Sequence, residues 1–273
     1  MGYYNPPKPA KYNFDPKSKE PYRMSRSGLE LFVRCPRCFY LDKRLGIAPP
    51  PTPSFTLNSA VDTLLKKEFD IHRAKGETHP LLAKYSVNAR PVTHEKLNEW
   101  REVFKGIKFL HKPTNIEFYG GIDDLWINDK DEFIVVDYKA TSKEGKIDME
   151  DQWKASYKRQ LEIYQWLFRQ NGFNVSKTGY FVYCNALKDR KAFDAKLEFD
   201  IELIPYNGDD KWIEPKLIEA HKCLKSDLIP DRNENCDYCK YRFQSQKIEI
   251  DKKDLETKLE SDKKEPHLEG KLF

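Results

Sequence analysis

The sequence predicts an α/β fold in which a small mixed β-sheet is flanked by helices. The first observation is the order of segments, which runs helix, three strands, helix, two strands, helix. The second is a pair of β-prone runs joined by the turn-forming stretch 128–131, a pattern typical of a hairpin. The third is two Cys-x-x-Cys pairs at opposite ends of the chain. A metal bound by both pairs would join the N- and C-terminal segments beside the sheet.

Helices are expected where apolar residues recur at helical spacing. Ser25 or Ser27 is positioned to cap a helix that continues to Cys35. A second helix is expected over 57–74, with one apolar face formed by Leu57, Val61, Leu64, Leu65 and Phe69. Further helices are expected over 95–105, 152–170 and 211–225.

Strands are expected in short β-prone runs bounded by turn residues. These runs cover 116–119, 124–128, 133–138, 178–184 and 197–205. Residues 1–24 are rich in Pro, Tyr and Lys and are expected to form an extended or disordered arm. The main domain is therefore placed at 25–245. Lys, Asp and Glu dominate 246–273, which is expected to be a solvated helix or disordered.

The composition restricts the class of protein. A chain of 273 residues suits one large domain with additions. Its net charge of +4 says little about a nucleic-acid partner, because any basic surface would have to be local. Neither a transmembrane run of roughly 18 apolar residues nor the apolar stretch of a signal peptide is found. The protein is therefore expected to be cytoplasmic.

An unusual group of charged residues lies at the end of two strands. Asp123 closes one apolar run, and the following strand ends in Asp137-Tyr138-Lys139. Because side chains alternate along a strand, Asp137 and Lys139 point to the same face. Two carboxylates and an amine suit a divalent metal and the hydrolysis of phosphodiesters. The alternative is a plain ion pair at a strand end. Asp124 points to the other face and is expected to be structural.

The helix over 152–170 adds two polar residues to this group. Gln160 and Tyr164 lie one turn apart on one face, where they could contact DNA and Lys139. The alternative is a simple amphipathic surface. Lys66 and Lys158 are among the basic residues that could line a DNA groove, although a solvated helix face explains each of them singly.

The cysteines form a second candidate site. Cys35 and Cys38 make one Cys-x-x-Cys pair, and Cys236 and Cys239 make the other. In a reducing compartment this spacing favours a tetrahedral metal site over disulfides. Such a metal would close a loop of about 200 residues and contribute folding free energy. Four unliganded thiols are the alternative. The remaining two, Cys184 and Cys223, are expected to be core residues.

The motifs G-G-I-D, V-V-D-Y-K-A-T and R-Q-L-E-I-Y-Q, in this order, resemble the PD-(D/E)XK nuclease superfamily. The RecB-like exonuclease branch, which includes CRISPR-adaptation nucleases and AddB-type repair nucleases, is the most similar. The resemblance implies a restriction-endonuclease-like core. It also implies that Asp123 and Asp137 bind Mg²⁺ or Mn²⁺ and that Lys139 assists the attacking water. Gln160 and Tyr164 would position the substrate and the lysine.

The chain departs from this branch at two places. The branch usually carries a metal-binding histidine on the early helix, where this chain has Asp62. Aspartate is a competent ligand of Mg²⁺ or Mn²⁺, and the alternative is an exposed helix residue. The branch also often holds a [4Fe-4S] cluster with one early and three late cysteines. Here the cysteines divide two and two, so both [4Fe-4S] and Zn²⁺ stay open.

These observations lead to two hypotheses about function. The first is a metal-dependent DNA nuclease, an exonuclease or a single-strand-preferring enzyme, acting in DNA repair, recombination or defence. The second is a catalytically weak or inactive nuclease-fold protein that binds nucleic acid or protein partners. The expected partner is DNA, single-stranded or at ends. Because no P-loop motif is found, a helicase or other repair partner would be supplied by another chain.

Overall fold

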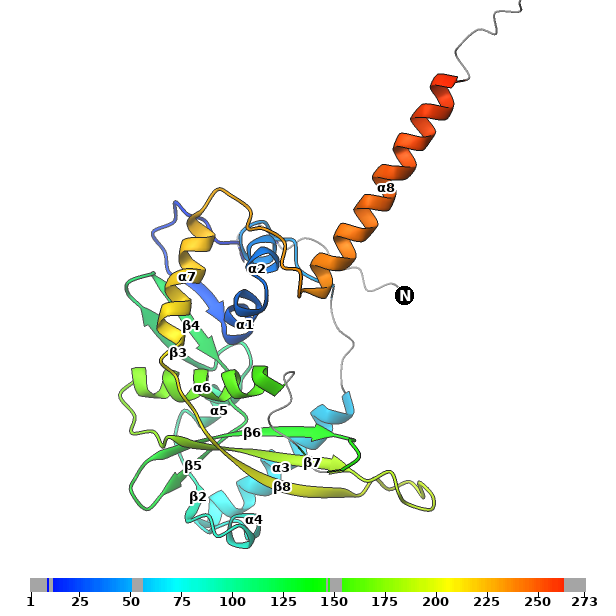
Figure 1. Ribbon diagram of the computed structural model, residues 1–273. Helices are drawn as coiled ribbons and strands as arrows, with labels where there is room; N and C mark the ends of the chain where they lie inside the picture. Colours follow the sequence, from blue (N-terminus) through cyan, green and yellow to red (C-terminus); the bar gives the residue numbers. More distant parts are fainter. Residues whose placement is uncertain (1–8, 10–11, 51–55, 146, 148–153, 263–273) are drawn as a thin grey trace, which may run out of the picture.

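Two β-sheets form the centre of the molecule, and helix α6 (Ala155–Gln170) lies between them (Figure 1). The computed structural model describes residues 9, 12–50, 56–145, 147 and 154–262. One buried cluster unites α6 with both sheets, since Leu161 and Phe168 pack in the same core as Phe118 and Phe181. The expected α/β architecture is therefore confirmed, with two sheets in place of one.

The larger sheet has the strand order β2-β5-β6-β7-β8. Its strands are β2 (Ala89–Pro91), β5 (Asp124–Asn128), β6 (Phe133–Thr141), β7 (Thr178–Ala186) and β8 (Phe199–Asn207). β5 and β6 form the expected hairpin, in which Asp124 pairs with Val136. β6 and β7 run parallel and are connected through α6, whereas the other neighbours are antiparallel. The sheet is therefore mixed, as expected.

The smaller sheet consists of β1 (Tyr22–Ser25), β4 (Ile116–Gly120) and β3 (Ile107–His111) in that order. The expectation of one sheet that holds all the strands is wrong for residues 116–119. β4 pairs with β1 and β3, and the chain leaves this sheet at Gly120 before β5 begins in the other. Phe14 and Met24, inside the segment expected as an arm, are buried in the core. From Phe14 onward that segment is therefore part of the packed domain.

The helices begin largely where the sequence indicates. α1 (Arg26–Arg34) is capped by Ser25, whose hydroxyl accepts a hydrogen bond from the Gly28 amide at 3.2 Å. The others are α2 (Pro36–Lys43), α3 (Thr56–Lys75), α4 (Pro80–Lys84), α5 (Leu97–Arg101), α7 (Ile213–Lys225) and α8 (Asp237–Asp262). α8 extends away from the body of the molecule (Figure 1). No helix in the described part of the chain is both long and apolar enough to cross a membrane.

Helix α3 differs from the expectation in the face that it buries. Leu65 and Phe69 are buried, whereas Leu57 and Leu64 are exposed. The buried face continues to Arg73, which donates a 2.8 Å hydrogen bond to the carbonyl of Val92. Asp62 and Lys66, four residues apart, share another face of the helix, which is turned towards Asp123 and Lys139.

Candidate active site and cysteine centre

The middle of strand β6 brings together the acidic residues that the sequence singles out. Asp137 is fully buried, and its carboxylate forms an ion pair with Lys139. Asp123, just before β5, accepts a 2.9 Å hydrogen bond from the backbone amide of Tyr138. The predicted position of Asp137 and Lys139 on one face is therefore observed, and a strand amide fixes the second carboxylate beside them.

Helix α6 supplies a side chain that orients Asp137. Gln160 Nε2 donates to Asp137 Oδ1 at 2.8 Å and lies 3.3 Å from the hydroxyl of Tyr164. Gln160 thus contacts the carboxylate, whereas the sequence argument expected it at the lysine. The Lys139 ammonium instead lies 4.6 Å from the centre of the Tyr157 ring.

Helix α3 contributes Asp62 and a lysine to the same site. Lys66 Nζ lies 2.8 Å from Asp62 Oδ2 and 3.5 Å from Asp123 Oδ1. A cavity of about 440 Å³ opens here, and its lining includes Asp62, Asp123, Lys139, Tyr157 and Gln160. The structure thus brings Asp62 to the place that the resemblance implies. It also adds Lys66, whose spacing of four residues from Asp62 was the available signal.

Burial and charge shift the ionisation of these groups. Burial raises the pKa of Asp137 to about 7, with Asp123 adding to the rise and Lys139 opposing it. Burial and the charge of Asp123 also raise the pKa of Asp62, against the effect of Lys66. Burial acts to lower the pKa of Lys139, but the carboxylates of Asp137 and Asp123 outweigh it and the net pKa is raised. Lys139 is therefore an ammonium ion at neutral pH.

A buried charge network supports the site from behind. Asp124 is fully buried and forms ion pairs with Arg73 and Arg101. Its carboxylate also accepts a 2.7 Å hydrogen bond from the hydroxyl of Tyr138. Arg101 in turn donates to the backbone carbonyl of Asp123 at 3.1 Å. The interpretation of Asp124 as a structural residue is consistent with this network. Neither arginine carries a sequence signal that would have identified its partner.

Gly120, which opens the first motif, makes room for Tyr164. A Cβ atom at this position would lie 2.6 Å from Cε1 of the Tyr164 ring, closer than real contacts allow. The glycine therefore permits the ring of α6 to pack directly against the end of β4. This close approach places the Gln160–Tyr164 turn beside Asp137.

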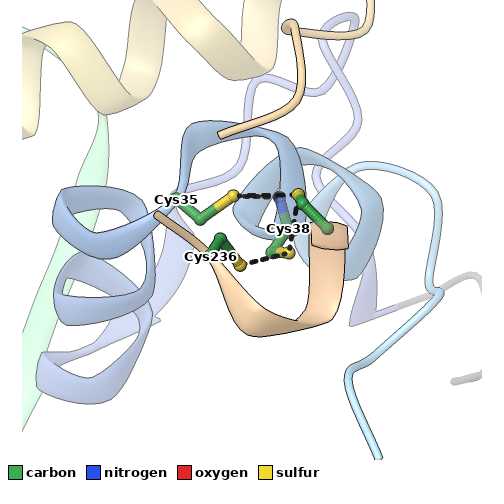
Figure 2. A group of neighbouring side chains, drawn as sticks. Cys35, Cys38 and Cys236 are labelled. Atoms are coloured by element: carbon green, nitrogen blue, oxygen red, sulfur yellow. Dashed lines mark hydrogen bonds between the residues drawn. The ribbon is translucent and has the colours of Figure 1, made fainter. Parts of the chain in front are cut away.

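The cysteine pairs meet at a second centre between the starts of α2 and α8. Cys35 and Cys38 lie at the start of α2, and Cys236 and Cys239 lie at the start of α8. Figure 2 shows the sulfur atoms of the labelled cysteines directed towards one another. Sγ–Sγ distances are 3.6 Å for Cys35–Cys239, 3.7 Å for Cys38–Cys236 and 3.9 Å for Cys38–Cys239.

The donor set of this centre fits a metal ion. All four sulfur atoms lie within 4.8 Å of one another. Burial raises the pKa of the Cys35 and Cys38 thiols, so a cation is needed to hold them as thiolates. A tetrahedral ion with bonds of about 2.3 Å to sulfur separates its ligands by about 3.8 Å, close to the observed distances. Cys184 is buried in β7 and Cys223 is half-buried in α7, both outside the cluster.

The carboxylate site also offers donors suited to a metal, although it is more open. Asp137 Oδ2 is buried and, beyond its ion pair with Lys139, has no partner among the described residues. Oxygen ligands of this kind suit Mg²⁺ or Mn²⁺. In the described part of the chain, however, Asp62, Asp123 and Asp137 do not converge as closely as the four thiols do. Lys66 and Lys139 balance their charge instead.

The strand hairpin, the Asp137–Lys139 pair and the glutamine on the following helix define a carboxylate–lysine site on the central strand of the larger sheet. The chain belongs to the PD-(D/E)XK nuclease superfamily, whose family model matches residues 23–244. Among solved structures it is similar to one titled "Crystal structure of SSO0001", with 21% sequence identity and a TM-score of 0.38. That match covers 74% of this chain and 77% of the other. No curated protein matches.

Proposed function

We propose that the protein is a metal-dependent nuclease that hydrolyses phosphodiester bonds in DNA. The observation that carries this proposal is the buried Asp137–Lys139 pair at the edge of an open cavity, with Asp123 fixed beside it. Membership in the PD-(D/E)XK superfamily supports it, because that superfamily is defined by nucleases. The nuclease-like domain is proposed to span residues 25–245, with the packed segment from Phe14 added before it and 246–273 as an appended tail.

Each side chain has a role that follows from its contacts. Asp123 and Asp137 would hold Mg²⁺ or Mn²⁺, with Asp62 as a further ligand from α3. An ion held there would supply positive charge to the phosphate and make a nearby water more acidic. Lys139, held as an ammonium ion, attracts the phosphate and stabilises the charge that develops on it. Gln160 fixes the orientation of Asp137, and Tyr164 packs behind Gln160.

The proposed substrate is single-stranded DNA or a DNA end, cut by an exonuclease or by a single-strand-preferring nuclease. Tyr157 lines the cavity and offers a ring on which an unpaired base stacks. The proposed setting is DNA repair, recombination or defence, with a helicase or other partner supplied by another chain. Thiolate metal ligands favour a reducing compartment, so we place the activity in the cytoplasm.

The alternative function is DNA or partner binding without catalysis. The observation that favours it is Lys66, which already pairs with two of the three carboxylates. Incubation of the purified protein with 5′-labelled single-stranded DNA and Mg²⁺ or Mn²⁺ separates the two proposals. Cleavage that is lost in Lys139→Ala and kept in the exposed control Lys130→Ala supports the nuclease. DNA binding with no cleavage under either metal supports the alternative.

For the cysteine centre, we propose a single structural Zn²⁺. The support is the spacing of the sulfur atoms, which suits one tetrahedral ion. A [4Fe-4S] cluster is bulkier and would spread the four thiolates further apart. Elemental analysis of anaerobically purified protein tests this. One zinc per chain in a colourless sample supports the proposal, and a brown sample containing iron overturns it.

A further inference from the structure

The ammonium group of Lys66 occupies the space between two carboxylates of the candidate active site. Its Nζ atom lies 2.8 Å from Asp62 and 3.5 Å from Asp123. The side chains involved are largely sheltered from solvent, with exposed fractions of 23% for Lys66, 32% for Asp62 and 23% for Asp123. One cation is therefore shared by two acidic residues from different parts of the chain, helix α3 and the position just before β5.

The two carboxylates require positive charge nearby. Asp62 and Asp123 both line the cavity, and like charges in a partly desolvated site repel each other. Lys139 is engaged with Asp137, and in the described residues Lys66 is the lysine that contacts both of the other carboxylates. Lys66 is thus their resident counter-ion, in the region where a divalent cation would have to coordinate them.

We propose that Lys66 is an intramolecular competitor of the divalent metal. Its ammonium group holds Asp62 and Asp123 together in the metal-free protein, and it leaves them when a divalent cation binds. This inference rests on the proposed function, because it takes Asp123 to be a metal ligand. Its consequence is that the site binds metal more weakly than its three carboxylates alone would allow.

The side chain and its surroundings allow this exchange. Lysine carries its charge on a flexible four-carbon stem, so the ammonium can move without a change in the helix. The cavity of about 440 Å³ beside it is lined by the polar residues Asn58 and Ser59 as well as by the carboxylates. A displaced ammonium therefore remains in a polar space, where a substrate phosphate would meet it.

Mn²⁺ binding to the purified full-length protein, measured without DNA by the EPR signal of free Mn²⁺, tests the proposal. The variants are Lys66→Met, Lys66→Gln and the matched control Lys67→Met, whose lysine is exposed and one residue away. The variant Asp123→Asn, made alone and together with Lys66→Met, shows whether the measured Mn²⁺ binds at the carboxylate site. Circular dichroism tests whether each variant is folded. If Lys66→Met is not folded, Lys66→Gln is used in its place.

We expect Lys66→Met to bind Mn²⁺ about tenfold more tightly than the wild type, since a nearby competing charge is removed. Lys67→Met should bind Mn²⁺ with the affinity of the wild type. Asp123→Asn, combined with Lys66→Met, should abolish the gain in Mn²⁺ affinity. Equal or weaker binding by both Lys66 variants, with binding that still depends on Asp123, overturns the competitor role but keeps the metal site. If no protein shows Asp123-dependent binding, the proposed metal-dependent function fails as well.

Discussion

Gln160 donates a 2.8 Å hydrogen bond to the carboxylate of Asp137, and so ties helix α6 to the middle of strand β6. The carboxylate is fully buried, and its other oxygen is engaged only by Lys139 among the described residues. Its orientation therefore depends on one amide and one ammonium. This dependence makes the helix that follows the hairpin part of the candidate active site.

Removal of the Gln160 amide should impair the site without unfolding the protein. In Gln160→Ala the Asp137 oxygen loses its donor, and loss of a residue that orients a metal ligand typically costs about 10–100-fold in activity or metal affinity. The measurement is the Mn²⁺-dependent cleavage rate of single-stranded DNA. Gln170→Ala, at the exposed end of the same helix, is the control and should retain the wild-type rate. Equal rates in the two variants would contradict the role given to Gln160.

The ion pairs of Asp124 with Arg73 and Arg101 should contribute strongly to the free energy of unfolding. Asp124→Asn removes the charge that faces Arg73 and Arg101, and breaking a buried ion pair on one side typically costs about 3–5 kcal/mol. Urea denaturation of the purified protein measures the free energy of unfolding. Asp227→Asn is the matched control, because its side chain is 95% exposed, and it should change stability very little. A loss for Asp124→Asn no larger than for the control would show that the network is not stabilising.

Gly120→Ala should push Tyr164 away from its place. The added methyl group would lie 2.6 Å from the ring, and overpacking of this kind costs about 1–3 kcal/mol. Because Tyr164 packs behind Gln160, nuclease activity should fall as well. The double variant Gly120→Ala with Tyr164→Leu relieves the clash, so the two stability losses should be less than additive. Strict additivity in thermal or urea unfolding would mean that the contact does not matter.

Loss of one cysteine ligand should weaken the metal-mediated connection between α2 and α8. In Cys236→Ser, bound metal should be lost and the melting temperature should fall by about 5–10 °C, since each kcal/mol shifts it by about 2–4 °C in a chain of this size. Metal content and melting temperature are measured on the same sample. Cys223→Ser, outside the cluster, should keep the wild-type metal content. If the Cys236→Ser variant kept its full metal content, Cys236 would not be a ligand of the metal.

Sequence patterns were sufficient for the hairpin and for the residues at its end. Alternation placed Asp137 and Lys139 on one face, and the turn at 128–131 placed Asp123 opposite them. Both patterns are local, so a single chain reveals them. The same reasoning missed β1 and β3, because short strands such as Tyr22–Ser25 are defined by their partner β4 and not by their own composition.

Long-range contacts between charged side chains could not be predicted from the sequence either. Arg101 contacts Asp124 from a separate helix, and nothing in its neighbourhood distinguishes it from other surface arginines. The apolar face of α3 was assigned from spacing alone, which included Leu57 and Leu64, although the sheet buries only the side that carries Leu65 and Phe69. Which side of an amphipathic helix packs is decided by its tertiary neighbours.

Asp137 and the residues around it are proposed to form a metal-dependent nuclease site. The most direct test is the initial rate of Mn²⁺-dependent cleavage of 5′-labelled single-stranded DNA by the wild type, Asp137→Asn and the exposed control Asp227→Asn. We predict cleavage by the wild type and the control, and a fall of at least about hundredfold in Asp137→Asn, because the site loses an anionic ligand of the proposed metal ion. A wild-type rate in Asp137→Asn, with both proteins folded, would contradict the account.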